Sequence, residues 1–245
     1  MVAMYAADTR ATPGGTVTEH TGLVLCGTPH GTAVNNMALV IGPIGGSVVR
    51  DLTDRVYGAV GRPFSVWTRA HADAQLEAEL AELGFHELIA LPGMVYADGD
   101  REPVAPPPEV VIRSVVDDAG RAAYADVMAA AYAVYGAPEE STRERFARLA
   151  SLHGADTQAF VAWKNGSAVA GATLVVAHGV GGVNWVGTLP AEFGHGYGAA
   201  VTWAVVQEGL RRGAAFLNLQ ASPMGAPVYR RMGFRTPTHY RVYVG

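Results

Sequence analysis

The sequence predicts an α/β (α+β) fold built on a mixed sheet. Residues 183–234 show, in order, a strand, a glycine-rich turn, a long helix, a second strand, a short helix and a Gly-Phe pair that ends it. A weaker version of the same order occurs earlier in the chain. Between the two versions, Asn165-Gly166 separates two apolar runs, which is the strongest short signal for a β-hairpin. These three observations indicate strands and helices that share one sheet.

Composition limits the classes of protein that the chain can belong to. At 245 residues it is long enough for one large domain or two small ones, and 49% of the residues are hydrophobic. No apolar run approaches the roughly 18 residues that span a bilayer, and the N-terminus lacks the pattern of a secretory signal. A net charge of −4 with scattered arginines argues against nucleic-acid binding. We therefore expect a cytoplasmic protein with no membrane or nucleic-acid partner.

The single cysteine excludes an intramolecular disulfide and a cysteine-based zinc site. Cys26 lies in the apolar run LVLCG, which favours a buried small side chain over a nucleophile. No cluster of His, Asp and Glu has the spacing of metal ligands, so no metal is expected.

A proline-rich linker divides the chain. The segment DGDREPVAPPPEV combines four prolines with five charged residues and little apolar content, so it is expected to be a stiff spacer. The predicted organisation is an N-terminal domain over residues 1–97, a linker over 98–108 and a C-terminal domain over 109–245. In the C-terminal domain we expect a strand over 110–115, helices over 117–136 and 138–154, strands over 158–164 and 168–178, a turn over 179–182 and a strand from 183 to 189.

The two domains show a moderate internal repeat. The order strand, helix, Gly-Phe, strand occurs over residues 64–97 and again over residues 215–244. Upstream of each copy, a strand and a glycine-containing turn lead into a helix, but the turn over 43–46 is several residues shorter than its counterpart. The repeat predicts two copies of one α/β unit, of which only the second keeps a full glycine loop.

That loop indicates the chemistry of a ligand. Gly194, Gly196 and Gly198 precede a helix, and such a turn presents bare backbone N–H groups where the helix dipole is positive. This arrangement suits a diphosphate. By itself a glycine loop is weak evidence, since the dinucleotide-binding fold uses a similar motif. That fold places an acidic residue about 20 positions later, and residues 216–220 contain no carboxylate.

The whole run over residues 183–234 closely resembles the coenzyme A-binding core of the GCN5-related N-acetyltransferase (GNAT) superfamily. The resemblance implies a tandem GNAT fold, with a mostly antiparallel central sheet, splayed strands and flanking helices. It further implies a degenerate N-terminal copy and a catalytic C-terminal copy. The implied activity is direct transfer of an acetyl group from acetyl-CoA to a primary amine, without a covalent enzyme intermediate.

The resemblance also assigns coenzyme contacts. The phosphate loop of the family runs Arg/Gln-x-x-Gly-x-Gly/Ala, and Phe193 stands where the family has Arg or Gln. This departure is expected to weaken coenzyme binding without abolishing it. His195 either supplies part of the missing positive charge or is a solvent-exposed loop residue. The implied coenzyme-binding residues are Val186, Gly187 and Thr188 on the strand, Phe193, Gly194, His195, Gly196, Tyr197, Gly198 and Ala199 in the loop and helix start, and Ser222, where the family often has Asn.

Tyr229 corresponds to the tyrosine that many relatives use as general acid toward the departing thiolate. The other interpretation is a core tyrosine on a short helix. No general base is identified, because the two central strands carry no Asp or Glu. His178, Asn184, Glu139, Glu140 and Glu192 are the polar residues considered for it. A non-catalytic acyl-CoA sensor on the same fold stays open as the alternative function, and the chain is expected to be a monomer or a homodimer.

Overall fold

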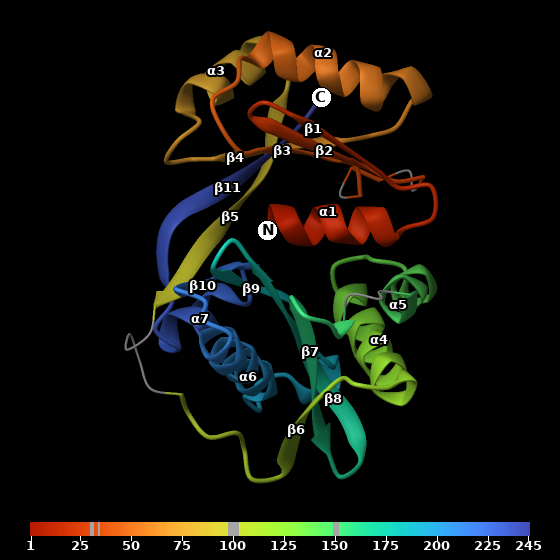
Figure 1. The fold of residues 1–245 in the computed structure, drawn as a ribbon, viewed down its shortest axis with the longest axis vertical. Coiled ribbons are helices and arrows are strands. Elements are labelled where there is room, and N and C mark those ends of the chain that lie inside the picture. Colours follow the sequence, from red (N-terminus) through yellow and green to blue (C-terminus); the bar gives the residue numbers. More distant parts are fainter. Residues whose placement is uncertain (30–31, 34, 98–102, 149–151) are drawn as a thin grey trace. The chain divides into compact units, whose positions relative to one another are not determined.

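The computed structural model describes residues 1–245 except 30–31, 34, 98–102 and 149–151 (Figure 1). The chain divides into two compact units. The first contains Met1 and residues 95–219 and 224–235, and the second contains residues 2–94, 220–223 and 236–245. Of the predicted linker, residues 98–102 lie outside the described residues, and 103–106 are neither helix nor strand.

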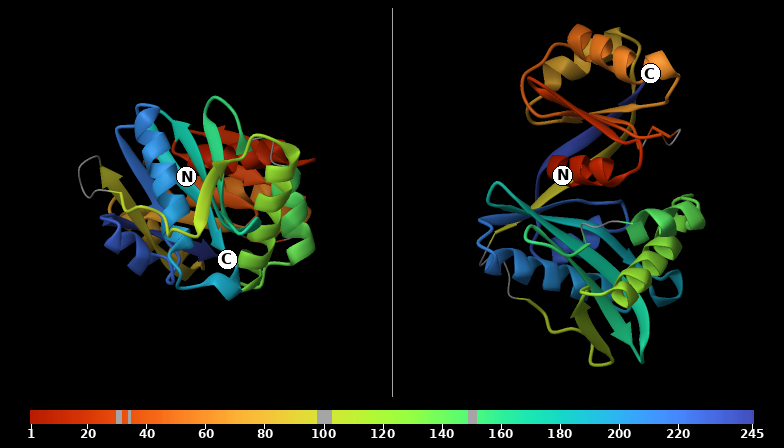
Figure 2. Two further views of the ribbon diagram at one scale, coloured as in Figure 1. Left: turned by 90° about the horizontal axis from the view of Figure 1, so that it is seen from below. Right: turned by 45° about the vertical axis from the view of Figure 1, so that its right-hand side comes forward.

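In the first unit, helices cover both faces of a five-strand array with the order β10-β9-β8-β7-β6. Helices α4 and α5 lie on one face and α6 on the other (Figures 1 and 2). The strands are β6 (Val110–Ser114), β7 (Thr157–Lys164), β8 (Ser167–Ala177), β9 (Val180–Thr188) and β10 (Phe216–Gln220). The helices are α4 (Asp118–Ala133), α5 (Glu139–Arg148), the 3₁₀ turn η3 (Pro190–Glu192), α6 (Tyr197–Arg211) and α7 (Ala226–Arg231).

Hairpins explain the antiparallel part of this array. Asn165 and Gly166 have φ values of 50° and 82°, the left-handed pair that a tight hairpin turn requires, and β7 pairs antiparallel with β8 on either side of them. Both β6 with β7 and β8 with β9 are also antiparallel. By contrast, β10 runs parallel to β9, because the long helix α6 connects them. The predicted mixed, mostly antiparallel sheet is therefore confirmed.

In the second unit the strand order is β1-β2-β3-β4-β11-β5. Its strands are β1 (Thr16–His20), β2 (Leu23–Gly27), β3 (Met37–Val40), β4 (Ser65–Arg69), β5 (His86–Ala97), which continues into the first unit, and β11 (Arg235–Val244). Its helices are α1 (Val2–Ala11), α2 (Gly46–Val56), the 3₁₀ turn η1 (Gly58–Val60) and α3 (Ala74–Glu82). Cys26 is fully buried in β2, as its apolar run predicts.

The repeat is visible in the topology of both units. In each, a parallel strand pair is connected by a helix, β3–α2–β4 in the second unit and β9–α6–β10 in the first. The compact units nevertheless differ from a linear division of the chain, because β11, the last strand, pairs antiparallel with β4. The domain boundaries at residues 97 and 109 follow the sequence repeat. They remain a prediction.

Two features differ from the sequence pattern. Helix α1 has no counterpart among the predicted elements. The turn expected over 179–182 ends earlier, and β9 already begins at Val180. Gly181 and Gly182 pair with β10 instead of turning, and a Cβ on Gly181 would lie 2.2 Å from the Leu217 side chain. These glycines thus serve close packing of strand against strand.

Candidate active site around the β9–α6 loop

Strand β9 separates from β10 along most of its length. In the described residues their pairing covers Leu217 with Gly181 and Asn218 with Gly182, whereas the pairing of β9 with β8 continues to Thr188. The C-terminal half of β9 therefore has one edge without strand partners. Val186, Gly187 and Thr188 lie on this half, so their backbone amides are placed where an extended ligand with amide groups could add as a strand.

Two of the predicted site glycines are required by close packing. A Cβ on Gly187 would lie 2.7 Å from Met128 Cε and 2.9 Å from Ala131 Cβ, because α4 crosses β9 at this point. A Cβ on Gly198 would lie 3.0 Å from Thr188 Oγ1. Helix α6 can thus begin directly against the end of β9 only where its first turn carries glycine. This close approach fixes the position of the loop relative to the open strand edge.

A β-bulge precedes the open half of β9. The register with β8 shifts between Gly171 and Thr173, and Trp185 adopts a left-handed backbone conformation with φ 48°. A buried chain of hydroxyls holds this strained residue, since Thr173 Oγ1 donates to the Tyr124 hydroxyl (2.7 Å) and Tyr124 donates to the Trp185 carbonyl (3.0 Å). The bulge changes the direction of the following backbone groups.

The loop itself is shaped by glycine. Gly194 and Gly196 have φ values of 84° and 83°, which only glycine adopts without strain, and Gly196 is the N-cap of α6. No side chain of the described residues caps this helix. The first-turn N–H groups of α6, including those of Tyr197, Gly198 and Ala199, therefore have no side-chain cap among the described residues and lie at the positive end of the helix dipole. This geometry fits a diphosphate.

The two side chains at the variable loop positions are exposed. Phe193 is 44% exposed. The His195 ring stacks on the Tyr197 ring at 5.6 Å between centroids, and its Nδ1 lies 3.8 Å from Glu192 Oε2. Exposure of His195 leaves both predicted interpretations open, because a protonated imidazole would pair with Glu192 as well as with a phosphate.

A polar cluster, which we call the Lys164 cluster, lies beside the loop and was missed by sequence reasoning. Lys164 Nζ donates to both Glu192 carboxylate oxygens, at 2.9 and 3.1 Å, and lies 5.5 Å from the centre of the Tyr197 ring. The Tyr197 hydroxyl donates to Glu109 at 2.8 Å. Burial raises the pKa of Tyr197, and the hydrogen bond to the Glu109 carboxylate raises it further. The sequence does contain one signal for this cluster, because Lys164 is the chain's only lysine.

Tyr229 lies on α7, with 8% of its surface exposed. Its hydroxyl pairs with Thr202 of α6, and the Tyr135 side chain lies close enough to interact electrostatically. Thr202 in turn donates to the Gly198 carbonyl at 2.8 Å, which connects Tyr229 to the first turn of α6. Burial raises the pKa of Tyr229 well above its ordinary value, and the electrostatic effect of Tyr135 adds to this increase. The phenol therefore holds its proton firmly.

The remaining predicted residues lie in different surroundings. Ser222 is half-buried in the segment 220–223, which belongs to the second unit. His178 lies in the β8–β9 turn, at the opposite end of β9 from the loop. Asn184 Nδ2 donates to the Gly182 carbonyl at 2.9 Å. Glu139 and Glu140 form the first turn of α5, where carboxylates favour the helix dipole. None of these positions identifies a general base.

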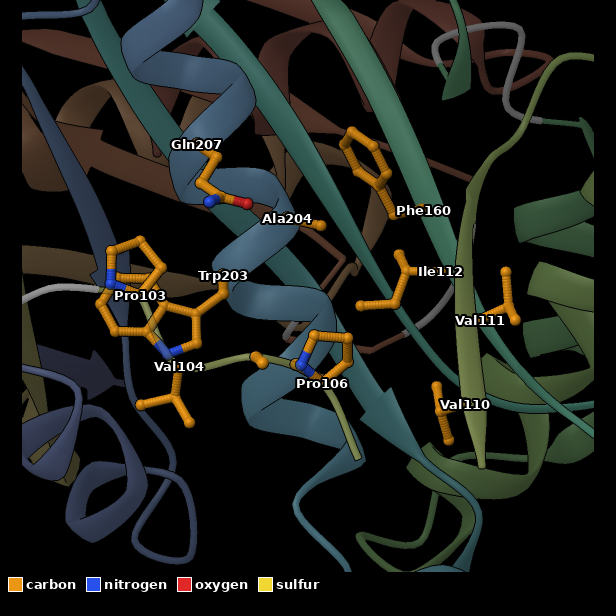
Figure 3. A pocket seen from close by; sticks show the side chains of 12 residues that line it. Pro103, Val104, Pro106, Val110, Val111, Ile112, Phe160, Trp203, Ala204 and Gln207 are labelled. Carbon is orange, nitrogen blue, oxygen red and sulfur yellow. The ribbon is translucent and has the colours of Figure 1, made fainter. Parts of the chain in front are cut away.

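A pocket of about 610 Å³ is lined by residues of α6, β6, β7 and the segment 103–106 (Figure 3). The pocket is apolar apart from Gln207, so it offers no group for proton transfer. Its lining comprises Pro103, Val104, Ala105, Pro106, Val110, Val111, Ile112, Phe160, Ala200, Trp203, Ala204 and Gln207.

The corresponding turn of the second unit is closed. Helix α2 begins at Gly46, and the Gly46 N–H donates to Glu79 Oε2 of α3 at 2.6 Å. A carboxylate of the chain thus occupies the helix start at which the first unit has an uncapped loop. The Gly46 N–H lowers the pKa of Glu79, because its hydrogen bond favours the ionised carboxylate.

Within the described residues, no group of three or more His, Cys, Asp and Glu side chains could hold a metal ion. No helix of the described part combines the length and apolar character needed to cross a bilayer.

The chain is similar to known proteins in sequence pattern and in fold. A family model described as "Acetyltransferase (GNAT) family" matches residues 122–234. A GCN5-related N-acetyltransferase from Kribbella flavida is 22% identical, with 99% of this chain and 93% of that chain covered and a TM-score of 0.77. A tandem GNAT protein from the clavulanic acid biosynthesis pathway is 15% identical, with 98% and 87% covered and a TM-score of 0.67. Comparison with the curated proteins gives no match.

The family model begins inside α4 and ends at Phe234, so it includes the bulge, the open edge of β9, the glycine loop and Tyr229. The two structural neighbours cover nearly the whole chain, which is consistent with two copies of the unit. The chain therefore has the tandem GNAT fold, and its residues 122–234 match the model of the acetyltransferase (GNAT) family.

Proposed function

We propose that this protein transfers an acetyl group from acetyl-CoA directly to a primary amine, with one active site per chain in the first unit. The observation that carries the proposal is the glycine-shaped, uncapped start of α6 directly beside the open edge of β9. One end of this site suits a diphosphate and the other suits an amide-bearing chain. Coenzyme A contains both groups, joined in one molecule.

The proposed binding mode follows from these two ends. The diphosphate accepts hydrogen bonds from the loop and from the first-turn N–H groups of α6, where the helix dipole adds to the attraction. The pantetheine amides pair with the backbone of Val186, Gly187 and Thr188, and the bulge at Trp185 directs the thioester end.

In the chemical step, the amine nitrogen attacks the thioester carbonyl carbon, a C–N bond forms and the C–S bond breaks. The sulfur leaves with the electron pair of the C–S bond, and the surplus proton of the amine passes to water. Tyr229 is proposed to donate a hydrogen bond to the departing sulfur. Because burial raises the pKa of Tyr229 above that of a thiol, about 8.5 for free cysteine, a hydrogen bond is favoured over complete proton transfer.

The test is the variant Y229F. It keeps the ring that packs 5.8 Å from Phe234 and removes the hydroxyl. We expect kcat to fall by about 10² or more, while the Kd for acetyl-CoA changes little. The matched control is Y96F, since Tyr96 is another buried tyrosine of this unit and packs 5.4 Å from Phe234. Turnover should be close to normal in this control.

Release of free thiol from acetyl-CoA, measured with a panel of primary amines, separates the proposal from its rival. An unchanged kcat in Y229F would remove the role of the hydroxyl. Binding of acetyl-CoA without turnover for any amine would instead favour a sensor of acyl-CoA on the same fold.

A further inference from the structure

The site contains a positive charge that neither the glycine loop nor the tyrosine explains. Lys164, the last residue of β7, reaches past the end of its strand to the loop before α6. Its ammonium group contacts Glu192 in the loop and lies over the ring of Tyr197, the first residue of α6. The side chain is 30% exposed, so part of it faces solvent. The only lysine of the chain is thus placed at the start of α6.

A diphosphate would meet an unfavourable charge here without Lys164. Glu192 lies in the loop, and Glu109 accepts from the Tyr197 hydroxyl at 2.8 Å. Two carboxylates near a bound diphosphate repel it, and Phe193 contributes no positive charge to oppose them. Backbone N–H groups and the helix dipole supply only partial charges. The ammonium group of Lys164 supplies a full one.

We propose that Lys164 is the cationic residue of the coenzyme site, and that Glu192 holds its ammonium group until the diphosphate takes the place of the carboxylate. The inference rests on the proposed function, because it assumes that the loop binds coenzyme A. This role would explain why the loop can carry Phe193, which is uncharged, because the positive charge for the diphosphate comes from Lys164 of β7 and not from a loop residue.

Lysine suits such an exchange of partners. Its ammonium group is a compact charge on a flexible four-carbon stem, and its three donors rotate freely. Before binding, two of these donors are used by Glu192. A diphosphate oxygen that approaches the start of α6 can replace one carboxylate oxygen without movement of the backbone.

The experiment compares K164M with E192Q. We expect K164M to raise the Kd of CoA by about tenfold or more, as the loss of a charged hydrogen bond predicts, and K164R to retain most of the affinity. In E192Q the Kd should stay the same or fall, because this variant frees the ammonium group and removes a negative charge. Calorimetric titration measures all four proteins, and thermal unfolding shows that each variant is folded.

The critical result is that K164M weakens CoA binding whereas E192Q does not. If Lys164 served only to anchor the loop through Glu192, both variants would weaken binding alike, and the proposal would be wrong. A second ligand, 3′-dephospho-CoA, keeps the diphosphate but lacks the ribose phosphate. The loss caused by K164M should be the same for both ligands; a loss seen with CoA alone would assign Lys164 to the ribose phosphate and overturn the diphosphate contact.

Chemical labelling gives an independent measurement. Because the chain has one lysine, acetylation by an amine-reactive ester marks a single ε-amino group, which mass spectrometry follows. CoA should slow the labelling of Lys164 several-fold. Labelling at an unchanged rate under saturating CoA would contradict the contact. If the wild-type protein bound no CoA at all, the proposed function would fail first, whereas normal wild-type binding with an unaffected K164M would refute only the role of Lys164.

Discussion

Tyr124 connects the core of the first unit to the backbone of its active site. The residue is fully buried in α4, and its hydroxyl lies between Thr173 of β8 and the Trp185 carbonyl of β9. The Tyr124 hydroxyl accepts a hydrogen bond from Thr173 and donates one to the Trp185 carbonyl, so one oxygen atom connects β8 to β9. Since Trp185 is held at a positive φ, the hydroxyl stabilises a conformation that a bulky residue would otherwise avoid.

The variant Y124F tests this role. Removal of the hydroxyl breaks its hydrogen bonds with Thr173 and with the Trp185 carbonyl, and we expect the free energy of unfolding to fall by about 1–3 kcal/mol. Turnover should fall as well, because the bulge that directs the thioester end loses its support. Urea unfolding and thiol-release assays measure the two effects.

The second unit offers a matched control. Tyr57 is also fully buried, and its hydroxyl donates to the Met37 carbonyl at 2.8 Å. Y57F should lose similar stability and keep normal turnover. Equal losses of turnover in Y57F and Y124F would show that general destabilisation, and not the bulge, lowers the activity.

At the scale of elements, the starts of α2 and α6 show why one copy is expected to bind the coenzyme. Both helices follow a strand and connect a parallel pair. The start of α6 lies behind a loop with two left-handed glycines, whereas α2 begins after a short turn and its first N–H is bonded to Glu79. In α2, the negative charge at the positive end of the dipole belongs to the chain itself.

We therefore expect E79Q to destabilise the second unit, with a dependence on pH that follows from its pKa. The hydrogen bond from the Gly46 N–H lowers the pKa of Glu79 below its ordinary value. Such a group contributes stability above its unfolded pKa, and the contribution is lost as the pH falls through the lower folded pKa. The difference between E79Q and wild type should thus be full at pH 7 and shrink in acid.

Urea unfolding at several pH values measures this difference. Glu82 lies on the same helix and is exposed, so E82Q is the matched control and should have little effect at any pH. A constant difference between E79Q and wild type down to the acid range would contradict the ionic role of Glu79.

The elements were largely predictable because their signals are local. Alternation, helical spacing and turn residues lie within a few positions of each other, and the Asn165-Gly166 hairpin and the loop glycines occur as predicted. The missed side-chain pairs join residues far apart. Lys164 and Glu192 are separated by 28 positions, Gly46 and Glu79 by 33, and Tyr197 and Glu109 by 88. No local pattern contains such a pairing.

At the scale of the whole molecule, the compact units could not be derived from the linear repeat. The linker and the two copies suggest a division near residues 97 and 109. Strand β11, however, pairs with β4 of the second unit, with Tyr240 opposite Arg69 and Tyr243 opposite Val66. Two copies of one unit present strands of similar pattern, and the sequence does not state which of them pairs with β4.

This pairing predicts that the N-terminal copy does not fold alone. Within the second unit, Tyr243 belongs to the apolar core and Arg241 Nη1 lies 2.8 Å from the buried carboxylate of Glu77. A fragment of residues 1–97 lacks β11, so β4 loses a strand partner and Glu77 loses its cation. The Arg241 side chain is 41% exposed, so the larger loss is the apolar core surface that Tyr243 covers, and a small domain has little stability to spare.

We therefore expect the fragment 1–97 to show no cooperative thermal transition by circular dichroism and poor dispersion of its amide signals by NMR. Residues 235–245, joined to its C-terminus through a flexible linker, should restore both. A shuffled version of the same eleven residues is the control, because it adds equal length and composition without the register of Tyr240–Tyr243 opposite Val66–Arg69. Cooperative unfolding of the unextended fragment would show that β11 is dispensable, and that the boundary of the fold follows the repeat.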